Sequence, residues 1–203
     1  MGEMNIPASG ITQGTPSGIL FGACTVHKNL KYDKEQKTWN FKESLTGATK
    51  GGSKFEVKPV IKAIEIDGAT VAVRELQQKL GEKATVEVSY TELTEDVIKS
   101  AVIGEENTKD APDGFTQIDS KALIVDGDYW DNIALVGKTM RGEPIIFIME
   151  NALCTSGLSV DTKDKDSSGS KLVFECTQTL DGQHDVLPYH ILYPKRAKAK
   201  GKK

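Results

Sequence analysis

The feature that most constrains this chain is a short alternating segment that runs almost directly into a helix. Over Ala84–Tyr90 apolar residues alternate with polar ones, which predicts a strand with one buried and one solvent-facing side. Thr94 then precedes two acidic residues, and both features favour the start of a helix. We predict this helix over Glu95–Ile103, ended by Gly104, with an apolar stripe that lies on the sheet.

A long strand is predicted just before this unit, over Lys54–Ile66. Its apolar residues change from odd to even positions after Pro59, which predicts a bulge or bend at that point. Asp67–Gly68 is a tight-turn signal. We expect Val71–Val73 to begin the next strand and Gly81–Glu82 to turn the chain again.

The rest of the chain consists of short apolar runs separated by turn-forming residues, a pattern typical of β-proteins. Pro144–Leu153 is the most hydrophobic run, and because both of its faces are apolar we predict that it lies between two layers. A hairpin is expected within Leu30–Leu45, and polar loops at Glu105–Ser120 and Asp161–Ser170. Further strands are predicted at Ile19–Val26, Ala122–Val125, Asn132–Met140, Leu158–Val160, Lys171–Gln178 and Pro188–Tyr193.

These elements predict a mainly β fold: a β-sandwich or partly closed barrel with one flanking α-helix, long loops and terminal arms. A length of 203 residues suits one domain. We therefore expect an N-terminal arm at residues 1–17, a single β-rich domain at 18–194, and a basic, flexible C-terminal tail at 195–203.

Charge is spread unevenly along the chain. The formal net charge is −3, but residues 195–203 hold six of the 26 basic residues. The remainder has 20 basic and 29 acidic residues, a formal charge of −9, so we do not expect it to bind a nucleic-acid backbone tightly. The sequence has no apolar run long enough to span a membrane and does not start like a secretion signal, so no membrane partner is expected.

The cysteines and histidines do not form a pattern that indicates chemistry. The three cysteines are odd in number and widely spaced, so they predict buried thiols and neither a disulfide framework nor a zinc site. His27 and His190 are expected at strand edges without partners. His184 precedes Asp185, but neighbours on a strand point to opposite faces, and no Gly-x-Ser-x-Gly elbow supplies a nucleophile. The cysteines are Cys24, Cys154 and Cys176.

Two loops resemble ligand-binding motifs only superficially. The acids that follow Asp161 are spaced as in a calcium loop, but the required glutamate at the twelfth position is replaced by Leu172. Gly47–Gly52 contains a lysine but lacks Gly-Lys-Ser/Thr and opens a strand. We therefore predict no catalytic, cofactor-binding or metal-ligating residue, no cofactor and no enzymatic activity.

Several phrases resemble the major tail tube proteins of long-tailed (siphovirus-type) bacteriophages. They are "GATKGG" at Gly47–Gly52, "IEIDG" at Ile64–Gly68, and a strand that leads into "TELTEDVIKSAV" at Thr91–Val102. The polar N-terminal arm and the closing "LPYHILYP" at Leu187–Pro194 are consistent with the resemblance. It implies a β-sandwich-like barrel with a flanking helix, in which six subunits form a ring and stacked rings form a tube.

This resemblance implies a structural virion protein, assembled in the host cytoplasm and located in the viral tail. Its partners would be identical copies, the tape measure protein, the tail terminator and tail-tip proteins, and double-stranded DNA that passes an acidic bore without sticking. Contacts between rings are expected from residues 1–17, Leu30–Lys54 and Glu105–Ser120. Two alternatives remain: the inner tube of a contractile tail or tail-derived secretion machine, and a monomeric β-sandwich adhesion or decoration domain.

Overall fold

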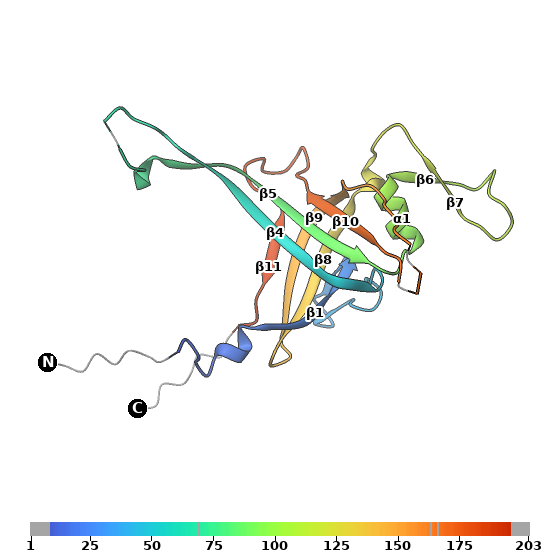
Figure 1. Ribbon diagram of the computed structural model, residues 1–203, viewed down its shortest axis with the longest axis horizontal. Helices are drawn as coiled ribbons and strands as arrows, with labels where there is room; N and C mark the ends of the chain where they lie inside the picture. Colours follow the sequence, from blue (N-terminus) through green and yellow to red (C-terminus); the bar gives the residue numbers. More distant parts are fainter. Residues whose placement is uncertain (1–8, 69, 163, 166, 196–203) are drawn as a thin grey trace.

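The computed structural model describes residues 9–68, 70–162, 164–165 and 167–195, and it is mainly β (Figure 1). The strands are β1 (Leu20–Lys28), β2 (Tyr32–Asp33), β3 (Thr38–Trp39), β4 (Thr49–Ala63), β5 (Gln77–Tyr90), β6 (Gly104–Asn107), β7 (Gln117–Ser120), β8 (Trp130–Thr139), β9 (Pro144–Cys154), β10 (Ser170–Cys176) and β11 (Tyr189–Leu192). The helices are α1 (Glu95–Val102) and the short 3-10 segments η1 (Thr15–Ser17), η2 (Arg74–Leu76) and η3 (Asp126–Asp128). The predicted mainly β class with one α-helix is thus confirmed for the described residues.

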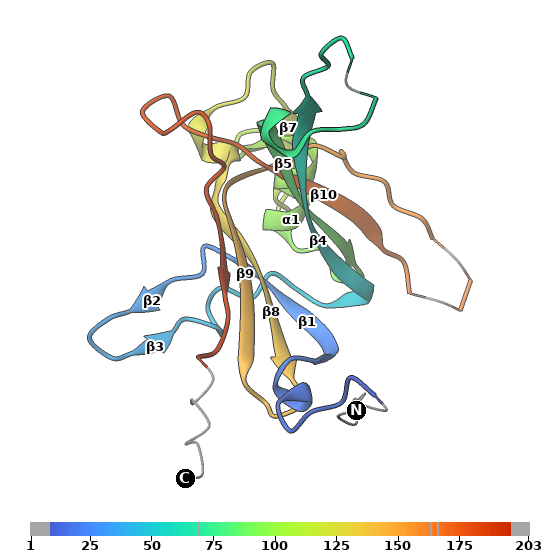
Figure 2. The same ribbon diagram turned by 90° about the vertical axis from the view of Figure 1, so that its left-hand side faces the viewer.

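Seven strands form one antiparallel sheet in the order β1-β8-β9-β10-β5-β4, with β11 also paired to β9. β9 changes partner at Asn151, because it pairs with β11 up to Met149 and with β10 from Ala152. Asn151 has a φ of 48°, a left-handed conformation that asparagine tolerates better than most residues. The sheet bends so that β4 and β5 lie across the core from β8 and β9 (Figure 2). It remains open, with β1 and β4 as its end strands.

The interior of this bent sheet holds the main core. The apolar residues of the predicted alternating strand, from Ala84 to Tyr90, are buried as expected. Trp130 and Phe174 pack against each other with ring centroids 4.6 Å apart. The Tyr90 hydroxyl lies 3.1 Å from Thr46 Oγ1, and burial raises the pKa of Tyr90 to about 12. The Tyr90 hydroxyl is therefore enclosed in the core together with a hydrogen-bonding partner.

A second apolar cluster covers the opposite face of β8 and β9. Its buried residues from those strands are packed by Leu30 and the rings of Trp39 and Phe41 from the β2–β3 region. The predicted hairpin within Leu30–Leu45 is present as β2 paired with β3. β9 is consequently buried on both faces, which confirms the prediction made from its composition. The residues of the two strands are Ala134, Val136, Ile146 and Ile148.

Helix α1 closes one end of the core. Thr94 caps it, since its Oγ1 accepts a hydrogen bond from the Val97 N–H at 3.4 Å. Val97 and Ala101 are buried in the main core, and Ser100 Oγ accepts a 2.7 Å hydrogen bond from Trp130 Nε1. The apolar stripe therefore lies on the sheet, as predicted.

The end of α1 differs from the prediction. Ile103, and not Gly104, adopts the left-handed conformation with φ 51°. Gly104 begins β6, and a Cβ there would lie 2.9 Å from the Asp119 carbonyl oxygen and 2.7 Å from a methyl group of Ile118. This glycine is required by the close approach of β7 and not by the helix end.

β4 and β5 form one long hairpin, which corrects two predictions. Gly81–Glu82 was expected to turn the chain, but β5 continues through both residues. Val71–Val73 was expected to be a strand and lies in the connection instead. The predicted irregularity near Pro59 is present, because the register shifts between Val60 and Ile61 and leaves one extra residue on β5. The turn at residues 67–68 is also present.

The "GATKGG" phrase forms the entry into β4. Gly51 and Gly52 have φ values of 90° and 91°, which other residues adopt only at a cost. The register with β5 shifts between Thr49 and Ser53. The glycines thus allow a bulge at the beginning of the long strand.

Three further predictions are wrong. Glu105–Ser120, expected to be a polar loop, contains the paired strands β6 and β7. Ala122–Val125 and Leu158–Val160, expected to be strands, make no ladder in the described part of the chain. Of the predicted arm at 1–17, residues 1–8 lie outside the described residues, as do residues 196–203 of the predicted tail.

Candidate assembly surfaces

The two end strands of the main sheet have open outer edges. β4 is paired only with β5 in the described structure, over its whole length. The outer edge of β1 is covered from Val26 onward, because the Lys28 N–H donates to Ser44 O at 2.7 Å and the Thr46 N–H donates to Val26 O at 3.1 Å. Residues 20–25 have no main-chain partner on that side within the described residues. Such edges are available to strands of another chain.

The distal part of the β4–β5 hairpin projects from the body (Figure 1). Seven of its apolar side chains are between 37 and 76% exposed and belong to neither core cluster of the described residues, whereas Leu76 is half-buried. Single exposed apolar residues are ordinary, but a group on one projecting element marks an interaction surface. We call this group the apolar hairpin tip; it comprises Val60, Ile61, Ile64, Ile66, Val71, Val73 and Leu80.

The root of the hairpin is fixed by one carboxylate. Glu82 is 4% exposed and pairs with Lys79 at 2.6 Å. It also accepts hydrogen bonds from the Leu187 N–H at 3.2 Å and from the Tyr189 hydroxyl at 3.4 Å. The hydrogen bond from Lys79 outweighs the effect of burial and lowers the pKa of Glu82. Glu82, at which sequence alone predicted a turn, therefore anchors the hairpin to Leu187 and to the first residue of β11.

A second exposed apolar group lies toward the other end of the long axis, just before η3. Leu123, Ile124 and Val125 are 76, 52 and 52% exposed. Their composition predicted a strand, but they form none and belong to neither core cluster of the described residues. We call these three residues the apolar patch.

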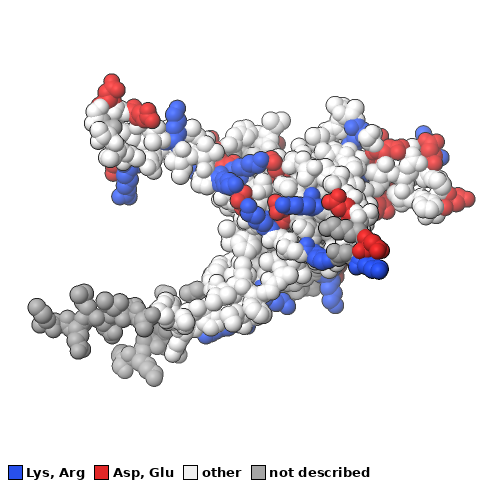
Figure 3. All heavy atoms as spheres, in the orientation of Figure 1, with Lys and Arg blue, Asp and Glu red and all other residues white. Residues whose placement is uncertain are grey.

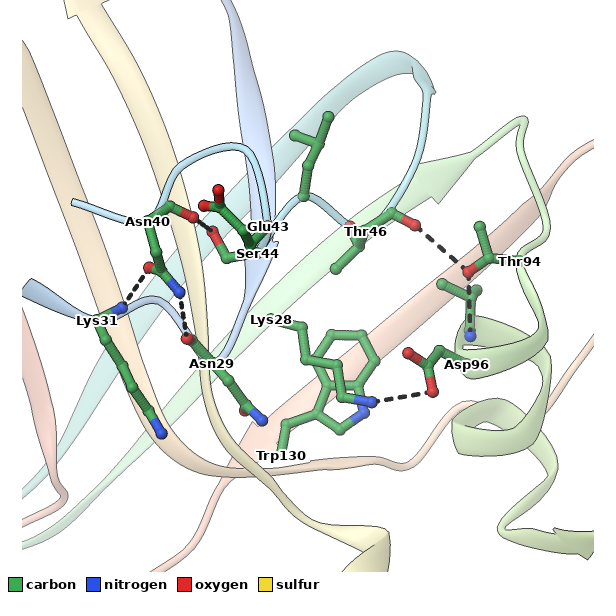
Figure 4. Close-up of a pocket in the computed structure, with 12 residues that line it drawn as sticks. Lys28, Asn29, Lys31, Asn40, Glu43, Ser44, Thr46, Thr94, Asp96 and Trp130 are labelled. Carbon is green, nitrogen blue, oxygen red and sulfur yellow. Dashed lines mark hydrogen bonds and ion pairs between the residues drawn. The ribbon is translucent and has the colours of Figure 1, made fainter.

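One cleft, of about 440 Å³, opens between α1 and the segment at residues 40–46 (Figure 4). Lys28 crosses its floor, where its Nζ lies 3.1 Å from Asp96 Oδ1 and 5.2 Å from the centroid of the Trp130 ring. The ammonium group is thus already held by an anion and an aromatic face. Lys31 and Glu43 complete a wall of mixed charge, which favours neither cationic nor anionic ligands.

Behind this cleft lies a buried serine–histidine pair that sequence reasoning missed. His27 Nδ1 is 2.9 Å from Ser44 Oγ, and His27 Nε2 is 2.8 Å from Thr25 Oγ1. The Ser44 hydroxyl donates to Asn40 O at 2.7 Å, so Nδ1 acts as the donor to Ser44 and cannot take its proton. Burial lowers the pKa of His27. The arrangement fastens the 40–46 segment to β1, and among the described residues no carboxylate is bonded to His27 to orient it as a general base.

The other two histidines and the three cysteines have surroundings that indicate structural roles. His190 is not isolated, since its Nε2 lies 3.2 Å from Glu150 Oε1. His184 is exposed and bonds the Leu180 carbonyl at 3.0 Å. Cys154 and Cys176 are buried free thiols, as predicted, and Cys24 is half-buried. Among the described residues no group of three or more His, Cys, Asp or Glu side chains could hold a metal ion.

Another cleft, of about 510 Å³, lies where β8 begins and where β9 and β10 end. Its lining contains the Tyr129 ring, the exposed Leu180, and the carboxylates of Asp126 and Asp131, with no basic residue among the described lining. Asp131 lies 3.7 Å from Lys31 in an exposed ion pair. We call this site the acidic cleft.

Carboxylates are also concentrated in the β6–β7 hairpin at the far end of the molecule (Figure 3). Glu105 and Glu106 lie on β6 and Asp119 on β7, and Lys99 pairs with Glu106 at 3.1 Å. The hydrogen bonds from Asn107 and Gln117 lower the pKa of Asp119. This hairpin is therefore negatively charged at neutral pH, in line with the acidic balance of the chain.

Comparison of the sequence with protein-family models and with curated proteins finds no match. Within the described residues, α1 and the 3-10 segments are all too short or too polar to cross a bilayer. The function proposed below therefore depends on the surfaces described above and on the resemblance given by the sequence.

Proposed function

We propose that this chain is a self-assembling structural subunit, and specifically a tail tube protein of a long-tailed bacteriophage. The observation that carries the proposal is the apolar hairpin tip, which projects from the body on the extended β4–β5 hairpin. Burying exposed apolar side chains stabilises association by roughly 25 cal/mol per Å² before the entropy of binding is subtracted. In this proposal the hairpin buries these side chains against another copy of the same chain.

The open edges support the same proposal. Alternate residues of β4, a strand of 15 residues that includes Pro59, turn main-chain groups toward its outer edge, and a neighbouring strand would pair with them. The tip and the apolar patch lie toward opposite ends of the molecule (Figure 1), so contact between them in a head-to-tail arrangement of copies would be heterologous. Heterologous contacts give closed rings when the rotation closes and open stacks when it does not.

The acidic balance supports passage of DNA through such an assembly. Without residues 195–203 the chain carries a formal charge of −9, and carboxylates facing a bore would repel phosphate. In this proposal the subunit works in the virion tail, with identical copies, the tape measure, terminator and tail-tip proteins as partners. It would perform no catalysis and need no cofactor.

Mass photometry and negative-stain microscopy of the purified chain test the proposal. We expect rings near a sixfold repeat, or stacked tubes, as the concentration is raised. A chain that stays monomeric at millimolar concentration would overturn self-assembly and favour the monomeric adhesion domain. Tubes that bind a sheath protein would instead favour the contractile-tail alternative.

A further inference from the structure

We propose that the acidic cleft binds the basic C-terminal segment, Lys195–Lys203, of a second copy of this chain. The inference rests on the proposed self-assembly and identifies one of its contacts. Six of the nine residues in the segment are Lys or Arg. The cleft offers the Tyr129 ring and the carboxylates of Asp126 and Asp131, a combination that suits extended, cationic side chains.

The charge of the lining distinguishes this cleft from the one beside α1. Lys28 and Lys31 line the cleft at α1, and an incoming lysine would meet both of them. The acidic cleft has no basic residue in its described lining. One of its carboxylates already has a cationic partner, since Lys31 Nζ is 3.7 Å from Asp131 in a pair exposed on both sides. Because exposed pairs of this kind contribute little, another ammonium group can replace it.

The cleft also has an apolar part suited to lysine stems. Leu180 is 92% exposed and lines the cleft together with Tyr129. Lysine and arginine side chains cover apolar surface with their methylene groups while the charged end reaches a carboxylate. An aromatic ring, a leucine and two carboxylates therefore match a lysine-rich peptide better than a small anion or an apolar ligand.

The strand register favours a second copy over the same chain as the source of the segment. β11 pairs with β9 from Tyr189 opposite Met149 to Leu192 opposite Ile146, so it leads away from Asn151 in the cleft. At about 3.3 Å per residue, Leu192 is roughly 17 Å from the cleft and Lys195 roughly 26 Å. Residues 196–203 span at most about 29 Å when fully extended. Bent back on its own chain, the segment would bring only its last residues to the cleft.

Binding of a labelled peptide tests the site without requiring assembly. We would titrate a fluorescent peptide of sequence KRAKAKGKK with the full-length protein at low salt and follow its anisotropy. We expect saturable binding that weakens by roughly 2-fold to 30-fold in Asp126→Asn/Asp131→Asn, the loss of two exposed ion pairs, and that also weakens as salt is raised. Glu105→Gln/Asp113→Asn makes the same change in net charge elsewhere and should bind as the wild type does. Equal affinity for both double variants would overturn the proposal.

Cross-linking tests which copy supplies the segment. A mixture of ¹⁴N- and ¹⁵N-labelled full-length protein is treated with a carbodiimide, which joins amines to carboxylates. We expect cross-links between lysines of residues 195–203 and Asp126 or Asp131 that combine both isotopes. Links confined to a single isotope would overturn the intermolecular contact. If the peptide binds but no rings form, the proposed function fails alone; if rings form and the peptide does not bind, this inference fails alone.

Discussion

The apolar hairpin tip leads to a prediction with a calculable size. Ile61 and Leu80 are 60 and 61% exposed, and full burial of such side chains stabilises by roughly 1.5–3 kcal/mol each. If assembly buries the exposed part, each contributes roughly 1–2 kcal/mol. Ile61→Asp/Leu80→Asp should then lower the association constant about 30-fold to 1,000-fold, more if the new carboxylates are desolvated.

The isolated subunit should hardly change, because these side chains bury little of their surface within the chain. We expect the free energy of unfolding to fall by about 1 kcal/mol or less, measured by urea denaturation below the assembly concentration. Light scattering then gives the concentration at which tubes appear. Gln77→Asp/Gln78→Asp is the matched control, since it adds two carboxylates to the same hairpin and keeps the apolar residues. Tube growth by the Ile61/Leu80 variant at the wild-type concentration would refute the reasoning.

Three further predictions concern the subunit itself. Gly104→Ala should destabilise the subunit by about 1–3 kcal/mol because the added methyl group meets β7. Gly127→Ala, with nothing within 4 Å of the added carbon, should leave the stability nearly unchanged. Equal urea midpoints for the two variants would contradict this prediction. Because the folded pKa of Glu82 is lowered, its contribution is present above its unfolded pKa, about 4.3, and is lost as pH falls through the folded pKa. Glu82→Gln should flatten the stability–pH curve in that window, and an unchanged slope would count against the anchoring role. Burial raises the pKa of Cys176 to about 12 and also raises that of Cys154, so both should resist alkylation at pH 8 until urea unfolds the chain, as followed by mass spectrometry.

The parts of the fold that could be predicted depend on local patterns. The alternation at Ala84–Tyr90 and the Thr94 cap each report a buried face or a helix end through near neighbours. Pro144–Leu153 has apolar residues on both faces, and covering layers are the only way to bury them. Each of these patterns depends only on residues that are close in sequence, and the structure confirms all three predictions.

The parts that could not be predicted depend on contacts far apart in the sequence. Gly81–Glu82 is an ordinary turn signal, but Glu82 is held by Leu187 and Tyr189, more than 100 residues away. Leu123–Val125 has the composition of a strand, yet it pairs with no other strand among the described residues. A run of apolar residues indicates that burial is favourable, but it does not say whether the partner belongs to the same chain.

The two proposed contacts, one through the hairpin tip and one through the C-terminal segment, point toward the same neighbouring copy. In Figure 1 the hairpin tip and the end of the described C-terminal segment both lie toward one end of the long axis, while η3 and the β6–β7 hairpin lie toward the other. The apolar patch at Leu123–Val125 and the carboxylate of Asp126 are adjacent in sequence, so a single neighbouring copy could supply partners for both extensions. An apolar contact and an ionic contact made by the same pair of copies differ in salt dependence, since screening weakens only the second. Raising the ionic strength should therefore weaken assemblies of the wild-type chain. Assemblies of a chain truncated after Lys195 should not change. If the truncated chain showed the same salt sensitivity as the wild type, the C-terminal segment would make no such contact.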